Sequence, residues 1–427
     1  MSGCRNHWCG IWLDAIILPY LFAFGHKLQA QSIPEMKDET KLVTTGRDPQ
    51  NNHGVVNPPV YHASTVLFPT VAELERSQKE RLQNDSVFYG RYGTPTTFSF
   101  QNAVAKLDGG HRTIALPSGK NAILVSLMAF LKSGDHLLMV DSVYGPTRSL
   151  CDGLLARYGV TTTYYDPLIG SGISELVRPK TKVIFTESPG SQTFEVQDIQ
   201  AISEVAHKNN CLLLLDNTWA TSLFFKPFEH GVDVSIQAAT KYIVGHSDAM
   251  LGVITGTQET FGALQESALD MGAPPGPDDV YLGQRGLRTL RVRLDRHMST
   301  GLVLAAWLEQ QDMVSKVLHP GLPGDPGNQT WQRDFMGASG LFGVVLKPTS
   351  KSAVAQMLDQ MELFKMGYSW GGYESLIVPT NPSHQRTATQ WDASYPTLRI
   401  HAGLEDPQDL RQDLCQGLQR LAHASKS

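Results

Sequence analysis

Residues 211–216 read CLLLLD and residues 233–241 read DVSIQAATK, so each of two apolar runs leads to a charged side chain. The first run is apolar enough to be a strand buried on both faces, and the second is also of strand length. In an open α/β sheet, ligands bind beyond the carboxyl ends of the strands, where Asp216 and Lys241 would both lie. A desolvated lysine at such a place can have the lowered pKa that a Schiff-base lysine requires. On spacing alone, the more common outcome is that the two residues pair with each other or reach solvent separately.

Segments of strand length and helix length alternate from Gly109 onward. The expected strands are residues 136–141, 160–166 and 182–187, and the expected helices are residues 122–134, 146–159 and 197–210. This alternation is typical of βαβ units and of a mainly parallel sheet that helices cover on two faces. The sequence therefore predicts an α/β domain over residues 96–288.

The pattern changes beyond Leu282. Residues 282–311 can form one long helix, although three glycines lower its helical propensity. A Pro/Gly-rich segment follows, and then come an expected strand at 341–347, a helix at 351–364 and a strand at 375–379. These elements predict a smaller α+β domain over residues 289–427.

Two N-terminal regions lack this alternation. Residues 36–95 are rich in Pro and Asn, and we expect them to form an arm with little core of its own that contacts a neighbouring subunit. Residues 1–35 contain an apolar stretch interrupted by Asp14, which is shorter than the ~20 residues of a membrane-spanning helix. This stretch has some features of a secretory signal. Its positive charge is weak, so we favour an extension that the working protein does without, with Met36 as the start.

The charge balance and the cysteines limit the classes of partner. The chain has 427 residues with 36 Lys and Arg against 41 Asp and Glu, a formal net charge of −5. Without a basic excess, neither nucleic acid nor an anionic membrane surface is an expected partner. The five cysteines are scattered and odd in number, which favours a reducing compartment, the cytoplasm. Cys4, His7 and Cys9 are followed by no second pair at zinc spacing, so no metal site is expected.

Three motifs carry a resemblance to a known family: TESPGSQTFEVQDI (186–199), LLLDNTWAT (213–221) and SIQAATKYIVGHSDAMLG (235–252). They resemble the pyridoxal-phosphate-dependent enzymes of cysteine and methionine metabolism, the trans-sulfuration enzymes, and the resemblance runs from about Lys41 to the C-terminus. It implies the aminotransferase-like α/β fold (fold type I), with a mostly parallel seven-stranded sheet domain and a smaller α+β C-terminal domain. It also implies a homotetramer built from pairs of dimers.

The resemblance implies which residues bind pyridoxal 5′-phosphate. Lys241 would hold the cofactor as a Schiff base, and Asp216 would keep the ring nitrogen protonated. The backbone N–H groups of Gly119 and Lys120, at the start of an expected helix, would bind the phosphate. The hydroxyl of Thr240 would add a further phosphate donor.

Aromatic and arginine side chains complete the expected site by the same resemblance. Tyr144 would stack on the cofactor ring and assist Lys241 in catalysis. Tyr89 and Arg91, in FYGRYGTPT, match the pair that reaches across a dimer into the neighbour's site, Arg91 to the phosphate and Tyr89 to phosphate and substrate. Arg399, in LRIHAGLED, matches the arginine that binds the substrate α-carboxylate, a task that suits its planar fork. Each residue alone has a simpler explanation, such as core packing or a surface ion pair. The occurrence of all of them in the family's order outweighs these explanations.

The segment YSWGGYES (368–375) resembles the β-lyase form of the family, in which Ser369 and Trp370 precede a glycine pair and would contact the substrate. We therefore expect β-elimination of L-cystathionine to L-homocysteine, pyruvate and ammonia, a step of methionine biosynthesis, with Lys241 as the base. The alternatives are cysteine desulfhydrase or cysteine-S-conjugate β-lyase activity, and then a γ-lyase or γ-synthase. A cofactor-binding protein with a mainly non-catalytic role is the alternative from a different class.

Overall fold

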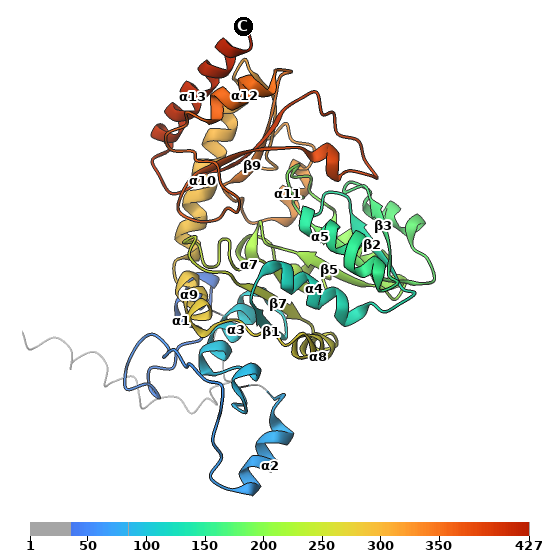
Figure 1. Cartoon of the computed structure of the whole chain (residues 1–427), viewed down its shortest axis with the longest axis vertical. Coiled ribbons are helices and arrows are strands. Elements are labelled where there is room, and N and C mark those ends of the chain that lie inside the picture. The colour runs from blue at the N-terminus through green and yellow to red at the C-terminus, as the bar shows by residue number, and fades with distance from the viewer. Residues whose placement is uncertain (1–35, 84, 427) are drawn as a thin grey trace, which may run out of the picture. The chain divides into compact units, whose positions relative to one another are not determined.

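A seven-stranded sheet is the centre of the larger part of the chain (Figure 1). The structure is a computed structural model that describes residues 36–83 and 85–426. The strands are β1 (Arg112–Leu116), β2 (His136–Val140), β3 (Thr161–Tyr165), β4 (Thr181–Glu187), β5 (Leu212–Asp216), β6 (Val234–Gln237) and β7 (Gly252–Gly256). Their order is β1-β7-β6-β5-β4-β2-β3, and β7 runs antiparallel to both of its neighbours, whereas the other pairs are parallel. The mostly parallel sheet of the predicted fold class is confirmed, although the apolar pattern does not predict β1 and β7.

Helices connect these strands and pack against the sheet. They are α3 (Pro95–Asp108), α4 (Gly119–Phe130), α5 (Gly145–Leu150), α6 (Ile199–Lys208), α7 (Thr221–Phe224) and α8 (Phe261–Met271). The predicted helix at 122–134 is α4, which begins earlier because the Ser118 hydroxyl caps it by accepting the Asn121 N–H at 3.1 Å. The predicted helix at 146–159 is divided into α5 and a π-helical turn, Cys151–Leu155. The other predicted elements of this part lie within two residues of their expected ends.

The single helix predicted over residues 282–311 is wrong, because two helices, α9 (Pro277–Leu287) and α10 (Leu290–Leu308), occupy this region. The break follows from how α9 packs on the segment after Lys241. A Cβ on Gly286 would lie 2.1 Å from the Ile243 carbonyl oxygen, so only glycine permits this approach. The Gly286 carbonyl accepts a hydrogen bond from Arg293 Nη2 at 2.8 Å, and the same guanidinium donates to the Tyr242 carbonyl at 2.7 Å. The guanidinium of Arg293, which follows the bend, therefore holds the backbone next to Lys241 in place.

A second, smaller sheet lies in the C-terminal part of the chain. Its strands are β8 (Val314–Leu318), β9 (Leu341–Leu346), β10 (Leu376–Thr380) and β11 (Thr397–His401), in the antiparallel order β10-β11-β9-β8. Helices α11 (Asn328–Asp334), α12 (Lys351–Leu358) and α13 (Pro407–Ala424) accompany it, and its apolar residues form a second buried cluster with those of α10, α12 and α13. The smaller α+β part is thus confirmed, whereas the exact domain boundaries stay predictions.

The arm differs from both sheets in having little buried surface. Helix α1 (Asp38–Thr44) buries Leu42, but α2 (Val71–Glu80) has no buried residue. Leu67 is 88% exposed and Val71 is 71% exposed. In Figure 1, α2 lies apart from the sheets at the lower end of the view. The arm therefore presents apolar side chains to solvent in the single chain.

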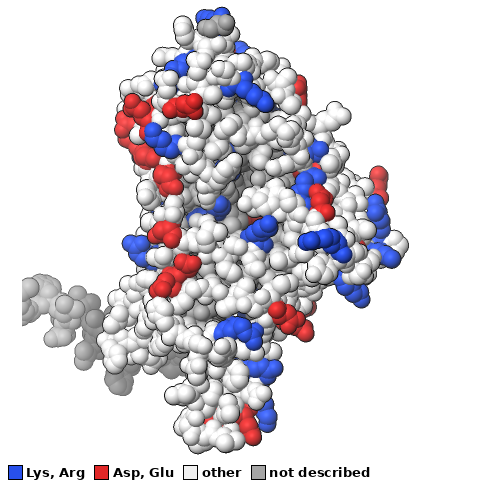
Figure 2. Space-filling model, viewed as in Figure 1, with Lys and Arg blue, Asp and Glu red and all other residues white. Residues whose placement is uncertain are grey.

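Charged side chains of both signs lie on the surface of the described chain (Figure 2). Figure 2 shows Lys and Arg interspersed with Asp and Glu over the face in view, without a continuous area of one sign. Among the described helices, none combines the length and apolarity that crossing a bilayer demands. The predictions for residues 1–35, including those on Cys4, His7 and Cys9, lie outside the described residues.

Candidate active site

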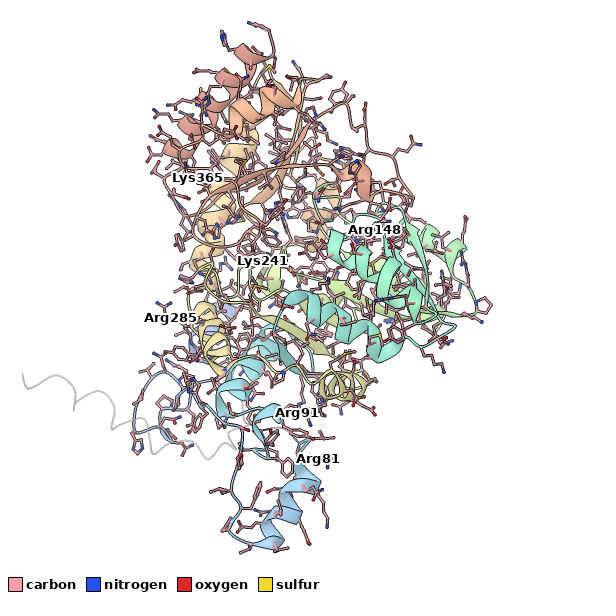
Figure 3. All side chains as sticks on the ribbon, in the orientation of Figure 1. Arg81, Arg91, Arg148, Lys241, Arg285 and Lys365 are labelled. Carbon is pink, nitrogen blue, oxygen red and sulfur yellow. The ribbon has the colours of Figure 1, made fainter. Side chains whose placement is uncertain are left out.

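Lys241 lies in the turn that follows β6, at the carboxyl edge of the large sheet. Its Nζ donates a hydrogen bond to Ser369 Oγ at 2.5 Å and lies 5.3 Å from the centre of the Trp370 ring. Burial, reinforced by the positive charge of Arg399 and partly opposed by Asp216, lowers the pKa of Lys241 to about 8. A larger fraction of this amine is therefore neutral near neutral pH than of an ordinary lysine, and the neutral form is the one that acts as a nucleophile or a base. Figure 3 places Lys241 between the two sheets.

Asp216 ends β5 at the same edge of the sheet. One of its oxygens, Oδ1, accepts hydrogen bonds from the Thr218 N–H at 3.0 Å and from the Thr218 hydroxyl at 2.5 Å. Burial raises the pKa of Asp216, and the Thr218 donors and the charge of Lys241 oppose this rise. Among the described ion pairs, none joins Asp216 to Lys241, whose amine contacts Ser369 instead. Simple charge pairing, the more common outcome on spacing alone, is therefore not what the chain forms.

Glu187 is a second carboxyl group beside Asp216 that the sequence analysis missed. Both residues end parallel strands, and the register of β4 with β5 pairs Glu187 directly with Asp216. Burial and the charge of Asp216 raise the pKa of Glu187 well above its usual range. One signal could have revealed it: KVIFTE and CLLLLD are neighbouring buried strands that both end in an acid.

Tyr144 begins α5 and is connected to this acidic pair. Its backbone N–H donates to Glu187 Oε2 at 2.8 Å, while its side chain is 43% exposed. Burial and the charges of Glu187 and Asp216 raise the pKa of the Tyr144 phenol, whereas Arg399 opposes them. The predicted ring-stacking residue thus lies within electrostatic range of both the acids and the predicted carboxylate-binding arginine.

The segment before β10 carries Ser369 and Trp370 to Lys241. Ser369 and Gly371 have positive φ angles of 84° and 86°, and a Cβ on Gly371 would lie 2.9 Å from the backbone of Lys241. Arg399 Nη2 donates to the Ser369 carbonyl at 3.1 Å, and the Gly371 N–H donates to His401 Nε2 at 3.2 Å. Strand β11 therefore supplies both the predicted substrate arginine and the histidine that holds this segment in place. His401 was also missed from the sequence.

The helix N-terminus predicted to bind phosphate adjoins this edge. Gly119 is buried, and a Cβ there would lie only 2.4 Å from the Ala238 Cβ. Within residues 36–83 and 85–426, the N–H groups of Gly119 and Lys120 have no backbone acceptor. Thr240 Oγ1 accepts the Leu251 N–H at 2.9 Å and donates to the Leu251 carbonyl at 3.1 Å. Its predicted role as a phosphate donor stays a prediction.

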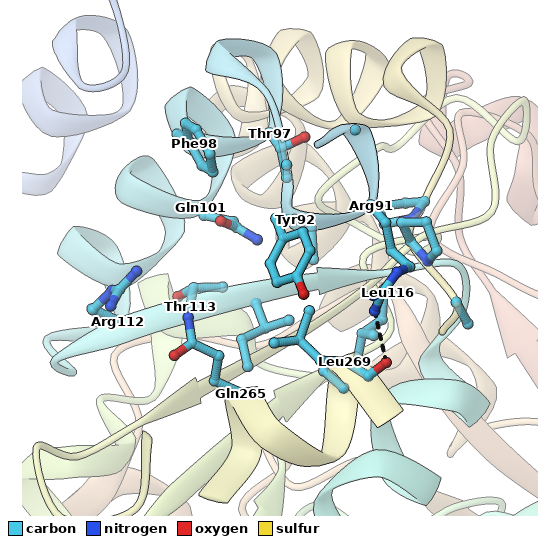
Figure 4. Close-up of a pocket in the computed structure, with 18 of the residues that line it drawn as sticks. Arg91, Tyr92, Thr97, Phe98, Gln101, Arg112, Thr113, Leu116, Gln265 and Leu269 are labelled. Atoms are coloured by element: carbon cyan, nitrogen blue, oxygen red, sulfur yellow. Dashed lines mark hydrogen bonds between the residues drawn. The ribbon is translucent and has the colours of Figure 1, made fainter. Parts of the chain in front are cut away.

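Tyr89 and Arg91 lie on the arm rather than at Lys241. Arg91 Nη1 donates to the Leu269 carbonyl at 3.0 Å, drawn as the dashed line in Figure 4. Arg91 lines a cavity of about 90 Å³ together with Arg81 and Arg112, between the arm, α3, β1 and α8. The described contacts of Tyr89 and Arg91 include none with Lys241 or Asp216. A single chain thus leaves these two residues outside the candidate site.

The residues at the sheet edge fit pyridoxal phosphate on their own chemistry. Lys241 offers an amine of lowered pKa for the aldehyde, and Asp216 offers a buried carboxyl group for the ring nitrogen. The start of α4 offers N–H groups without backbone acceptors in the described chain, at a position where a side chain on Gly119 would collide with Ala238. Each functional part of the cofactor therefore meets a suitable partner.

Comparisons with known proteins agree with this fit. Residues 39–419 match the family described as Cys/Met metabolism PLP-dependent enzyme. The chain is 43% identical over 393 residues to the cystathionine β-lyase MetC of Escherichia coli (strain K12), which covers 91% of this chain and 99% of that protein. It is 40% identical over 396 residues to the L-alanine/L-glutamate racemase of Wolbachia pipientis wMel, which covers 90% and 98%.

A solved structure leads to the same family. The structure of metB from Corynebacterium glutamicum superposes with a TM-score of 0.83 at 30% identity, over 90% of this chain and 98% of that chain. The sheet order, the lysine after β6 and these matches give one conclusion: the chain belongs to the Cys/Met metabolism PLP-dependent enzymes.

Proposed function

We propose that this protein is a carbon–sulfur lyase that uses pyridoxal phosphate to cleave L-cystathionine by β-elimination, yielding L-homocysteine, pyruvate and ammonia. The observation that carries the proposal is the contact of Lys241 Nζ with Ser369 Oγ, beneath Trp370 and beside Arg399. A relative 43% identical over nearly the whole chain is named a cystathionine β-lyase. The reaction is a step of methionine biosynthesis.

Each residue of the site has a separate role in the reaction. Pyridoxal phosphate supplies an aldehyde for the substrate amine and a ring that stabilises negative charge at Cα. Lys241, with a pKa of about 8, removes the Cα proton. Asp216 holds the proton on the ring nitrogen, and Arg399 orients the substrate through its α-carboxylate. Tyr144, whose backbone N–H donates to Glu187, would stack on the ring and assist catalysis.

Trp370 supports elimination at Cβ rather than at Cγ. Its ring lies 5.3 Å from Lys241 Nζ and 5.4 Å from the ring of Tyr242, which is fully buried. A large side chain held against Tyr242 narrows the space over the amine. The thioether is then restricted to poses that align the Cα proton and the Cβ–S bond.

The racemase relative favours one second candidate. Removal of the Cα proton by Lys241 and its return to the opposite face would racemise an amino acid that has no leaving group at Cβ. Cysteine desulfhydrase, cysteine-S-conjugate β-lyase and γ-elimination activities would use the same base with other leaving groups.

Assembly and location complete the proposal. A homotetramer of two dimers would bring Tyr89 and Arg91 of one copy to the Lys241 of another, and it would cover the exposed apolar side chains of the arm. The scattered cysteines favour a cytoplasmic enzyme.

One product analysis tests the function. Purified protein loaded with pyridoxal phosphate is incubated with L-cystathionine, and pyruvate, 2-oxobutyrate and both thiols are quantified. We expect pyruvate and homocysteine in equal amounts. Formation of 2-oxobutyrate and cysteine would replace β- with γ-elimination. In a parallel incubation with L-alanine, loss of optical purity without any keto acid in either incubation would favour the racemase.

A further inference from the structure

Glu187 and Asp216 form a pair of carboxyl groups at the edge of the large sheet. Their positions are fixed by the parallel register of β4 and β5, which pairs Glu187 with Asp216. Paired residues of adjacent strands project from the same face, and the strands lie ~4.8 Å apart. Asp216 is buried and Glu187 is partly buried. Two negative charges on adjacent strands in such a place repel strongly, so the pair holds one charge at lower cost than two.

The donors around the pair decide which carboxyl group keeps the charge. Asp216 Oδ1 accepts two hydrogen bonds from Thr218, and Asp216 is also attracted by the charge of Lys241. Glu187 accepts one side-chain hydrogen bond, from the Tyr144 N–H, and faces the negative charge of Asp216. Hydrogen bonds to a carboxylate favour its ionised form. The negative charge therefore stays on Asp216.

The hydrogen bond that the Glu187 carboxyl group accepts has a structural consequence for Tyr144. Tyr144 has φ −47° and ψ 126°, precedes the first turn of α5 and has no side-chain cap. Its N–H is one of the donors that a helix start leaves without a partner in the helix. The Glu187 carboxyl group satisfies this donor and fixes the direction in which the Tyr144 ring leaves the backbone.

We propose that Glu187 is a positioning residue of this site, which acts as a neutral carboxylic acid: it holds the Tyr144 backbone in place and leaves the negative charge of the pair to Asp216. The inference rests on the proposed cofactor site but not on the identity of the substrate. Burial and the charge of Asp216 raise the pKa of Glu187 well above its usual range, in agreement with a neutral acid at neutral pH.

The neutral isostere Glu187→Gln gives the sharpest test. Its amide oxygen can still accept the Tyr144 N–H, so the variant should keep the visible circular dichroism of the bound cofactor, the cofactor affinity and kcat/KM within about 3-fold of wild type. Glu187→Ala removes the acceptor and should change the visible circular dichroism and lower kcat/KM about 10-fold or more. If Glu187→Gln is as defective as Glu187→Ala, the charged form is required and the proposal is overturned. If Glu187→Ala equals wild type, Glu187 positions nothing.

Two further measurements separate positioning from a general loss of structure. Infrared difference spectra between wild type and Glu187→Gln at pH 8 should show the C=O stretch of a protonated carboxylic acid only in wild type, and its absence would overturn the proposal. In a Tyr144→Ala background, Glu187→Ala should cause no further change in the visible circular dichroism; an additive change would contradict an action through Tyr144. If Glu187→Ala does not fold, Glu187→Gln and the infrared band decide. Neither readout requires cystathionine, so a failure of the proposed substrate leaves this test intact.

Discussion

The residues around Lys241 and the residues of the arm are both expected to serve one site, but they differ in how many contacts and how much burial hold them in a single chain. Around Lys241, the segment before β10 and strand β11 bring Ser369 and Arg399 into connected contacts with the amine, and Asp216 at the end of β5 acts on the amine through its charge. On the arm, Tyr89 is 41% exposed and Arg91 bonds to a carbonyl of α8. The first region is brought together within one chain, whereas the described contacts of Tyr89 and Arg91 do not include Lys241 or Asp216.

The difference between the two regions shows that burial and strand register fix functional side chains only where the chain has a hydrophobic core beneath them. Register places Asp216 beside Glu187, and glycines at 119, 286 and 371 permit close approaches that no side chain would allow. The arm has less support of this kind, because α2 buries no residue and Leu42 is the buried residue of α1. We expect its two functional residues to become ordered at a site only when a second copy covers them.

The largest effect is expected from Lys241→Ala, which removes the base and the amine that holds the cofactor. Turnover should fall by about 10⁴-fold or more, and the visible absorbance of the bound cofactor should be lost. Lys351→Ala, an exposed lysine at the start of α12, is the matched control and should behave as wild type. Retained pyruvate formation by Lys241→Ala would refute the assignment.

Arg399→Lys tests substrate binding in the region around Lys241. The substitution keeps the positive charge but removes the planar fork, so kcat/KM for cystathionine should fall roughly 10–100-fold, mostly through KM. Arg411→Lys, on the exposed face of α13, controls for the exchange itself. An unchanged KM would mean that another group binds the α-carboxylate.

On the arm, Arg91→Ala and Arg81→Ala distinguish a functional arginine from a neighbouring one. Both line the same cavity, but only Arg91 is expected to reach the phosphate in a neighbouring subunit. The dissociation constant of the cofactor, measured by titration of the apoprotein, should rise about 10-fold for Arg91→Ala and stay unchanged for Arg81→Ala. If both substitutions raise the dissociation constant equally, Arg91 contributes only through its positive charge and makes no specific contact with the phosphate.

The smallest expected effect is a pH dependence. Burial, followed by the charge of Arg399, lowers the pKa of Lys241 to about 8, and the amine reacts with an aldehyde only when it is neutral. The rate at which the apoprotein takes up pyridoxal phosphate should therefore rise with pH with a midpoint near 8. Removing the positive charge in Arg399→Gln should move that midpoint upward. A wild-type midpoint near the ~10.4 of an ordinary lysine would contradict a lysine held in a buried, positively charged environment.

Much of the large sheet could be predicted from the sequence because CLLLLD and its neighbours are buried on two faces and need no partner pattern to be recognised. Strand β1 (RTIAL) was missed because Arg112 and Thr113 interrupt its apolar pattern, and β7 was missed because it begins and ends with glycine. The break between α9 and α10 depends on Gly286 meeting Ile243, a contact across the fold that helical periodicity does not contain.

In the candidate site, too, some residues could be predicted from the sequence and others could not. Asp216 and Lys241 could be found at strand ends, but the contact of Lys241 with Ser369 joins residues 128 positions apart, and only the family resemblance linked them beforehand. Glu187 and His401 act through partners, Tyr144 and Gly371, which become visible only in three dimensions.

The central claim, that one chain builds the site around Lys241 and a second copy completes it, can be tested by subunit complementation. Lys241→Ala protein and a Tyr89→Ala/Arg91→Ala double variant are each assayed alone and then mixed in equal amounts under conditions that exchange subunits. In a two-fold symmetric dimer, half of the random pairs are hybrids, each with one intact site of two, so the mixture should recover roughly a quarter of wild-type activity. Activity no greater than the mean of the two separate variants would contradict the claim.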